Sequence, residues 1–309
     1  MRLGELDRRD LAARLERRGL DLDTGPFVVR IETPIPALVD EVQGLYRDYP
    51  LDEGGGLADF HVVVLSPSGP LGMRRWWRRQ ATVILDEDRP FEPLPLDMAV
   101  PMLEWSINWC AATRANQYVM IHAAVLERDG RALVLPGVSG AGKSTLCAGL
   151  ALRGWRLLSD EFALIRPGDG ALDPWPRPIS LKNTSIDLIR RWAPNAHMST
   201  PVPNTNKGTV AHLRPPADSV RRAREAATPA WLVFPVFAVG AAPSLTRVPK
   251  ARAFFRLADC SFNYPSLGIR GFRALSRMID ECDAYEFRYS SLDDALGLLG
   301  ALPSPTPTA

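Results

Sequence analysis

The chain has 309 residues, enough for one large domain or two ordinary ones. Its hydrophobic fraction of 46% excludes disorder over most of its length, and a net charge of only +2 creates no global field that would attract nucleic acid or an anionic membrane. The four cysteines are far apart and form no CxxC pair, which argues against a disulfide framework and a zinc site and favours a reducing cytoplasm.

The hydropathy of the chain also favours a soluble, cytoplasmic protein. The N-terminal residues mix acidic and basic side chains and lack the apolar core of a signal peptide. The longest apolar run, 230–242, is interrupted by Pro235 and is too short to span a bilayer. We therefore expect this run to be a buried strand.

Residues 1–115 are expected to form a small N-terminal α/β domain to which no chemistry can be assigned. Periodicity predicts helices at 1–20, 36–49 and 103–114, and strands at 27–31, 61–65, 73–80 and 81–85. The run 74–79 mixes arginine with tryptophan and could bind an anionic peptide or nucleic acid. An edge strand with extended arginine side chains is the alternative that we favour.

The pattern changes from residue 116, and we expect a second, catalytic domain at 116–300. Strands at 118–127 and 132–136 form a hairpin, with Asp129-Gly130 as its two-residue turn. A helix is predicted from Lys143 to about residue 153, with Gly154 as its left-handed stop, followed by a strand at 155–159. A basic helix is predicted near 220–226, and the Pro-rich residues 301–309 are expected to be a disordered tail.

A phosphate-binding loop is predicted between the hairpin and the helix. The segment Gly137-Val138-Ser139-Gly140-Ala141-Gly142-Lys143-Ser144 matches the pattern GxxxxGK[ST] in the strand–loop–helix context that this pattern requires. Its glycines permit positive φ, so that successive N–H groups can turn toward a phosphate, and the helix N-terminus adds partial positive charge. Lys143 is expected to reach the β- and γ-phosphates and Ser144 to bind Mg²⁺. The predicted ATP-binding residues are Gly137, Ser139, Gly140, Ala141, Gly142, Lys143, Ser144 and Thr145.

Counting residues places His122 and an acidic pair beside this loop. With Asp129-Gly130 as the turn, residues whose numbers sum to 259 face each other, so His122 lies opposite Gly137. The helix rises about 1.5 Å per residue and the next strand returns at about 3.3 Å per residue, which brings Asp160-Glu161 back to the level of the phosphates. An acidic pair there can supply a metal ligand and a base for a substrate hydroxyl. A core histidine and a solvated acidic turn are the alternatives.

Three stretches together resemble the HPr kinase/phosphorylase family. They are Ile121-His122-Ala123-Ala124, the phosphate loop, and Gly154-Trp155-Arg156-Leu157-Leu158-Ser159-Asp160-Glu161. The chain is more similar to the HPr-kinase-related kinases of type A, in which 178–183, 207–213, Glu104-Trp105 and Phe262-Asn263-Tyr264 also have similar counterparts. The resemblance to HPr kinase covers about residues 118–265, whereas the resemblance to the related kinases covers most of the chain.

This resemblance implies an α/β fold with a mixed-sheet P-loop kinase core of the kind shared with phosphoenolpyruvate carboxykinase. It implies that Asp160 takes the proton from a serine hydroxyl, while His122 and Glu161 hold this carboxylate and the metal shell. The implied metal ligands are Ser144, Asp160 and Glu161. The resemblance also assigns Lys182 and Lys207 to the active site, together with Lys143. The chain has 33 arginines but only four lysines, so three of the four lysines belong to the implied site.

The chain departs from HPr kinase at two positions. Ser180-Leu181-Lys182 stands where the family has a further glutamate of the metal shell, and Lys207 replaces an arginine that contacts phosphate. A small peptide is therefore at least as good a candidate acceptor as HPr. The stretch Asn206-Lys207-Gly208-Thr209 breaks the guanine-reading NKxD pattern, so GTP specificity is unsupported.

We conclude that the sequence predicts an ATP- and Mg²⁺-dependent serine kinase acting on a protein or peptide, with neither nucleic acid nor membrane as a partner. An ATPase, a nucleotide-sensing regulatory module and a bifunctional HPr kinase/phosphorylase are the alternatives. Homo-oligomerisation stays open.

Overall fold

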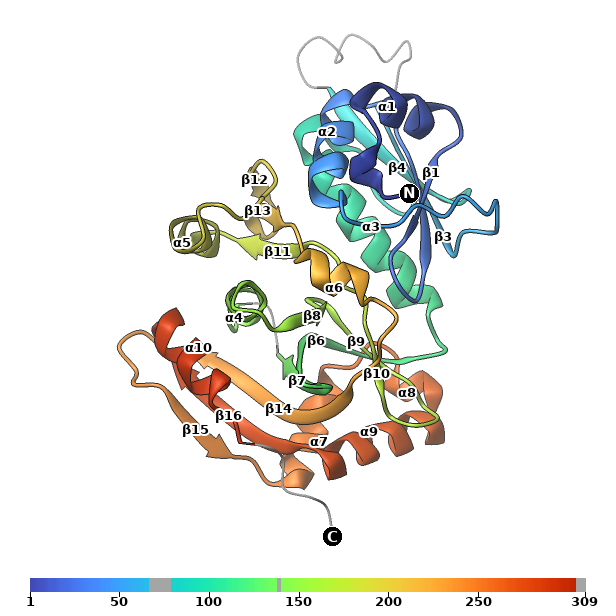
Figure 1. Cartoon of the computed structure of the whole chain (residues 1–309). Helices are drawn as coiled ribbons and strands as arrows, with labels where there is room; N and C mark the ends of the chain where they lie inside the picture. The colour runs from blue at the N-terminus through green and yellow to red at the C-terminus, as the bar shows by residue number, and fades with distance from the viewer. Residues whose placement is uncertain (67–78, 138–139, 304–309) are drawn as a thin grey trace.

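The computed structural model describes residues 1–66, 79–137 and 140–303. Several predicted features lie outside the described residues. They are residues 73–78 of the predicted strand 73–80, nearly all of the arginine-tryptophan run, Ser139, and residues 304–309 of the expected tail. The described chain is an α/β protein with mixed sheets (Figure 1). In this part of the chain, no helix combines the length and the apolar character needed to cross a lipid bilayer.

The N-terminal part is a five-stranded sheet with helices packed on it (Figure 1). Its order is β1-β2-β3-β4-β5, in which β2 and β3 run parallel and the other neighbours antiparallel. The strands are β1 (Leu20–Asp23), β2 (Val28–Glu32), β3 (Phe60–Leu65), β4 (Gln80–Leu85) and β5 (Leu94–Pro95). The helices are η1 (Leu3–Glu5), α1 (Arg8–Arg17), α2 (Pro36–Leu45), η3 (Leu96–Met98) and α3 (Ala99–Arg114).

The ends of the N-terminal helices differ from the prediction for local reasons. The Asp7 carboxylate accepts a hydrogen bond of 2.8 Å from the backbone N–H of Asp10, so α1 starts at Arg8 and the predicted helix 1–20 is divided. Helix α3 begins at Ala99 rather than at 103, because Pro101 falls in the first turn, where no backbone N–H is needed.

The central sheet has the order β10-β9-β6-β7-β14-β16-β15, with β8 also paired to β6. Strands β7, β14 and β16 run parallel, and the other neighbours run antiparallel, which makes the sheet mixed. The strands are β6 (Val119–Arg128), β7 (Arg131–Pro136), β8 (Arg156–Ser159), β9 (Phe162–Ile165), β10 (Leu172–Asp173), β14 (Thr228–Phe237), β15 (Ser244–Arg247) and β16 (Asp283–Tyr289). The predicted buried strand at 230–242 corresponds to β14, which ends at Phe237.

Alternate side chains of β6 enter two different cores. Ala124 and Leu126 belong to a core shared with α4 (Lys143–Leu152) and α10 (Leu292–Gly300). Ile121, Ala123 and Val125 belong to a core shared with α7 (Lys250–Asp259), α8 (Tyr264–Leu267) and α9 (Ile269–Glu281). Helices therefore cover both faces of the central sheet (Figure 1).

The N-terminal sheet and the central sheet share a continuous core. Met120 of β6, Phe162 and Leu164 of β9, and Trp175 belong to the same buried cluster as the strands and helices of the N-terminal sheet. The indole N–H of Trp175 donates a hydrogen bond of 2.9 Å to Thr24 across this junction. The N-terminal sheet and its helices are thus packed directly behind the strands next to the acidic pair.

A third, smaller sheet lies beside α4 (Figure 1). Its order is β11-β13-β12, formed by β11 (Ile179–Lys182), β12 (Val202–Thr205) and β13 (Gly208–Leu213), and α5 (Thr184–Trp192) follows β11. The predicted helix at 220–226 is wrong in position, since α6 spans Ala217–Arg221. The chain turns after α6 because the carbonyls of Arg222 and Glu225 accept hydrogen bonds from Arg156.

The predicted hairpin register is confirmed. Strands β6 and β7 pair antiparallel from Ala123 with Pro136 to Arg128 with Arg131, so the numbers of partners sum to 259. The turn residues Asp129 and Gly130 have φ of 54° and 77°, as a two-residue hairpin turn with positive φ at both positions requires.

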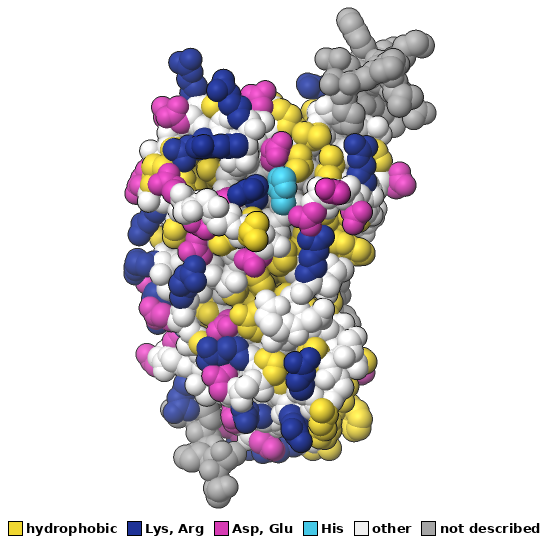
Figure 2. All heavy atoms as spheres, turned by 90° about the vertical axis from the view of Figure 1, so that its right-hand side faces the viewer, with side chains coloured by type: hydrophobic (Ala, Val, Ile, Leu, Met, Phe, Trp, Pro, Cys, Tyr) yellow, Lys and Arg dark blue, Asp and Glu magenta, His cyan; other side chains and the backbone are white. Residues whose placement is uncertain are grey.

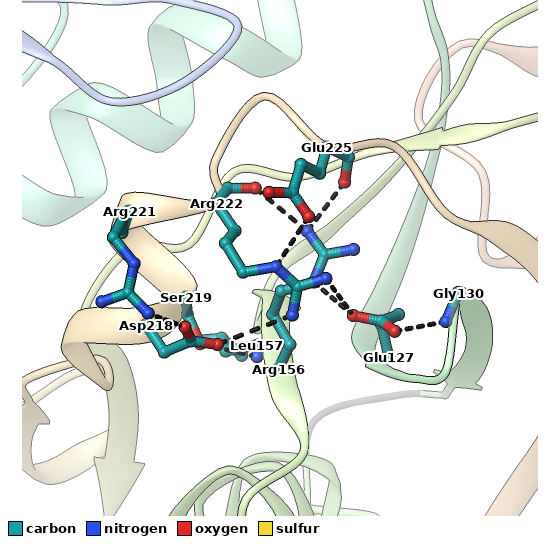
Figure 3. Close-up of polar contacts among 9 residues, drawn as sticks. All are labelled: Glu127, Gly130, Arg156, Leu157, Asp218, Ser219, Arg221, Arg222 and Glu225. Atoms are coloured by element: carbon teal, nitrogen blue, oxygen red, sulfur yellow. Dashed lines mark hydrogen bonds and ion pairs between the residues drawn. The ribbon is translucent and has the colours of Figure 1, made fainter.

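A buried ion pair fastens this hairpin to β8 and to the segment after α6 (Figure 3). The Arg156 guanidinium pairs with the Glu127 carboxylate, and both side chains are only 3% exposed. Glu127 also accepts a hydrogen bond from the N–H of Gly130, and Arg156 donates to the Arg222 and Glu225 carbonyls at 3.0 and 2.7 Å. Both charges are thus compensated within the protein.

Removing one partner of this pair is expected to destabilise the fold strongly. Arg156→Met leaves the buried Glu127 carboxylate with only the N–H of Gly130 and the more distant Arg222 guanidinium, at 3.6 Å, and breaking a buried pair of this kind costs about 3–5 kcal/mol. Denaturant unfolding of both proteins measures the difference. The matched control is Arg221→Met, whose side chain is 60% exposed and paired with an exposed Asp218. A loss no larger than that of the control would contradict the structural role of the buried pair.

Figure 2 shows acidic and basic side chains interspersed over the face that it draws. This mixture agrees with the small net charge of the chain. Hydrophobic side chains are scattered between the charged ones on the same face (Figure 2).

Candidate active site

An open cavity of about 450 Å³ lies where α4, β11, the β12–β13 turn and the end of β16 meet. Residues from seven separate parts of the chain line it. They include His122, Gly140, Gly142, Lys143, Ser144, Thr145, Asp160, Glu161, Lys182 and Lys207. These are all of the residues predicted for the site except Gly137 and Ala141, which adjoin the lining, and Ser139, which lies outside the described residues.

The described glycines before α4 have left-handed backbone conformations. Gly140 and Gly142 have φ of 91° and 89°, a backbone conformation that residues other than glycine rarely adopt. A Cβ on Gly142 would lie 1.9 Å from the phenol oxygen of Tyr289, so the residue must be glycine for steric reasons as well. The turn leads into α4, whose N-terminus carries a partial positive charge.

Lys143 is held inside the cavity by groups of the loop and of β6. Its ammonium donates a hydrogen bond to the Gly137 carbonyl and lies 3.5 Å from Nε2 of His122. Burial lowers the pKa of Lys143, and the nearby Asp160 and Glu161 carboxylates oppose this shift. The side chain therefore lies between the phosphate loop and the acidic pair.

His122 and Glu161 form a direct pair on the same wall. Nε2 of His122 lies 3.0 Å from a Glu161 carboxylate oxygen, and the two side chains are 30% and 26% exposed. Burial acts to raise the pKa of Glu161, but His122, Lys182 and Lys207 outweigh it, so that the pKa lies below its usual range. Glu161 is therefore an ionised carboxylate surrounded by cationic and polar groups.

Asp160 contacts the phosphate loop itself. One of its carboxylate oxygens accepts hydrogen bonds from the Ser144 hydroxyl at 3.1 Å and from the backbone N–H of Ser180 at 3.0 Å. The residue is 5% exposed. Burial and the neighbouring Glu161 raise the pKa of Asp160 to about 6, against the effect of its two hydrogen-bond donors. The counting prediction that this carboxylate returns to the start of the helix is confirmed.

Lys182 and Lys207 reach the cavity from the third sheet. Lys182 ends β11, and Lys207 lies in the β12–β13 turn. Asn183 links the two, because its amide accepts a hydrogen bond of 3.0 Å from Thr209 N–H and contacts the Lys207 carbonyl at 3.4 Å. The Lys207 ammonium lies 5.9 Å from the ring centre of Trp105. Burial, together with Lys182, lowers the pKa of Lys207.

The sequence did not identify several groups of the site. The backbone N–H of Ser180 binds Asp160, and Tyr289 closes against Gly142, while Phe237 and Leu292 add apolar surface to the cavity. Asn183 has a φ of 52°, unusual for a residue other than glycine. No local pattern distinguishes these residues, because only the pairing of distant strands brings them to the phosphate loop.

The oxygen donors of the site suit Mg²⁺. Ser144, Asp160 and Glu161 offer a hydroxyl and two carboxylates, and Mg²⁺ is commonly held by one or two carboxylates together with substrate phosphates. Within the described residues, no group of three or more His, Cys, Asp and Glu forms a ready-made metal cluster.

Together these features define an α/β protein with mixed sheets, in which a glycine-rich turn, a helix N-terminus and paired carboxylates line one cavity. Residues 94–189 match the family model described as SynChlorMet cassette protein ScmC. The matched stretch is 96 of the 309 residues (189 − 94 + 1) and includes α3, His122, the phosphate loop and the acidic pair. A comparison with curated proteins finds none that matches the chain.

Proposed function

We propose that this protein is an ATP-dependent serine kinase with a P-loop core of the HPr kinase type. The observation that carries the proposal is the hydrogen bond of 3.1 Å between the Ser144 hydroxyl and the Asp160 carboxylate. It joins the residue expected to bind the metal of Mg·ATP to a carboxylate able to accept a proton. Transfer of a phosphoryl group to a hydroxyl requires groups that bind the phosphates and, in contact with them, a base for the hydroxyl.

In the proposed reaction the triphosphate lies along the turn 137–142 and the N-terminus of α4. Lys143 would contact the β- and γ-phosphates, and Ser144 and the acidic pair would hold Mg²⁺, which would offset phosphate charge. Asp160 accepts the proton of the serine hydroxyl as the oxygen bonds to the γ-phosphorus and the bond to the ADP oxygen breaks. Lys182 and Lys207 approach from the opposite wall and offset the charge on the transferred group.

The two carboxylates are suited to different roles because their surroundings shift their pKa values in opposite directions. The pKa of Asp160 is raised by burial and by Glu161, which suits a base near neutral pH. The pKa of Glu161 is lowered by the surrounding His122 and lysines in spite of burial, which suits a charged metal-binding group. His122 holds Glu161 in place at 3.0 Å.

The experiment that tests this function separates a kinase from an ATPase or a nucleotide sensor. A kinase excludes water until its acceptor is bound, so purified protein alone should hydrolyse ATP slowly. With radiolabelled ATP, a library of serine-containing peptides or small proteins from its own cells should yield labelled products that are heavier by one phosphate. The kinase proposal fails if the protein alone hydrolyses ATP rapidly and labels no acceptor, and a sensor is indicated if ATP binds without turnover.

The binding of Mg²⁺ should depend on pH through Asp160. Its pKa is raised to about 6 in the folded protein, so the carboxyl is largely protonated below this pH and ionised above it. A cation that binds the ionised form must displace a proton at low pH. Mg²⁺ should therefore raise the melting temperature more at about pH 7.5 than at about pH 5.

Thermal melting with and without MgCl₂ at the two pH values measures this effect. Asp160→Asn is the control and should remove the difference, whereas Glu161 stays ionised at both pH values because its pKa lies below the usual range. Equal shifts at both pH values in the wild type would contradict a role for Asp160 in cation binding.

A further inference from the structure

A second cavity of about 20 Å³ lies against Asp160 and is lined by residues of α3, β9, β11 and β13. Glu104, Trp105, Arg177, Ser180 and His212 line it together with Asp160. This volume exceeds the space of about 10–15 Å³ that one water molecule needs, and it is too small for a ligand of several atoms.

Three buried polar atoms without a hydrogen-bond partner belong to residues that line this cavity. They are Oδ1 of Asp160, Nε of Arg177 and Nδ1 of His212. The three residues are 5%, 7% and 1% exposed. The described residues contain five such atoms in all, and the other two lie in β3 and β4 of the N-terminal sheet. An isolated buried polar group costs about 1–3 kcal/mol, so three around one small cavity indicate a shared partner.

The chemistry of the three atoms matches that of a single water molecule. The Nε–H of Arg177 is a donor only, Oδ1 of ionised Asp160 is an acceptor only, and Nδ1 of His212 can be either. A water that accepts a hydrogen bond from Arg177 can donate one to Asp160 and form a third with His212. Buried waters typically make about three hydrogen bonds.

We propose that one ordered water occupies this cavity, and that through it Arg177 and His212 are positioning residues for the Asp160 carboxylate. With Oδ1 held by the water, Oδ2 stays on Ser144 and on the N–H of Ser180. Both oxygens then have fixed partners, and the carboxylate cannot rotate away from the phosphate loop. The catalytic consequence rests on the proposed kinase function.

Polar contacts fix the Arg177 side chain, and strand pairing fixes the backbone of His212. The Arg177 guanidinium pairs with the Glu104 carboxylate and donates to the Asn108 side chain at 2.6 Å, while Tyr46 donates to Glu104 at 2.5 Å. His212 is the partner of Ser180 in the pairing of β13 with β11. The N-terminal part of the chain would in this way contribute to catalysis, by fixing Arg177 from α3 and α2.

Two substitutions at one position test the positioning role. His212→Asn keeps a polar atom near the place of Nδ1, and His212→Leu removes it at similar volume. We expect kcat to fall about 10–100-fold in His212→Leu and by much less in His212→Asn, with KM for ATP nearly unchanged in both. Melting temperatures show whether either variant is folded. Equal losses of kcat in two folded variants would overturn the positioning role.

A crystal structure of the unliganded protein tests the water site without any assay. The expected result is one water within hydrogen-bond distance of Asp160 Oδ1, Arg177 Nε and His212 Nδ1, and its loss in His212→Leu. A direct contact between His212 and Asp160, or a cavity closed by side chains, would overturn the proposal. A water that is present in a protein without kinase activity would support the site and refute the proposed function instead.

Discussion

Lys143→Ala is expected to abolish phosphoryl transfer while leaving the protein folded. The Lys143 ammonium lies between the Gly137 carbonyl and His122, at the wall of the cavity that carries the phosphate loop. No other ammonium reaches the γ-phosphate from this side in the proposed reaction. Removing a group that stabilises charge on the transferred phosphate typically costs at least about 10²–10³-fold in rate. We therefore expect kcat below the limit of detection and weaker binding of Mg·ATP.

Calorimetric titration of Mg·ATP and a transfer assay on wild type and variant measure both effects. Lys250→Ala is the matched control, because this lysine lies on the surface in α7, with a side chain 56% exposed. Equal affinity and equal turnover in Lys143→Ala and wild type would refute the assignment of the phosphate loop.

Asp160→Asn is expected to lower the transfer rate about 10²–10⁴-fold, the usual contribution of a general base. The amide keeps the size of the side chain and can still contact Ser144, so the loop should keep its conformation. Binding of ATP should survive because the glycine turn and Lys143 are unchanged. Pre-steady-state transfer to the acceptor, together with equilibrium binding of a nonhydrolysable ATP analogue, separates the two quantities.

Glu161→Gln is the companion variant. It removes the charge paired with His122 and should weaken binding of Mg²⁺ more than Asp160→Asn does. Asp160 contacts Ser144, the residue expected to bind Mg²⁺, so the same two variants also test whether Asp160 is the metal ligand and Glu161 the base. If Asp160→Asn loses Mg·ATP binding and Glu161→Gln loses only turnover, the roles of base and metal ligand must be exchanged.

The parts of the site that follow from the sequence are those fixed by local geometry. A two-residue turn at Asp129-Gly130 sets the register of the hairpin, and this register places His122 next to Gly137 in space. The helix and strand after the loop have known rises per residue, which return Asp160 to Ser144. These relations depend on chain distances of a few tens of residues at most, so counting is sufficient to obtain them.

Other features were decided only by tertiary packing. The sequence shows Lys182 and Lys207 as scarce lysines, but the pairing of β11 with β13 and the turn held by Asn183 bring them to the cavity. Glu104 and Arg177 are 73 residues apart, and their ion pair becomes evident only when α3 packs behind the acidic pair. The end of α6 likewise depends on a distant segment, because the carbonyls of Arg222 and Glu225 accept hydrogen bonds from Arg156.

The physical reason for this division is the range of the interactions. Backbone conformation at glycines, turn type and the rise of a helix or strand are properties of neighbouring residues. The sequence by itself therefore determined the hairpin, the glycine-rich turn before α4 and the return of the acidic pair to the start of this helix. The burial of Arg177, the pKa shifts of Asp160 and Glu161, and the small cavity beside Asp160 arise from the packing of three sheets. Only the tertiary structure decided these, because desolvation and charge pairing depend on which distant side chains share one interior.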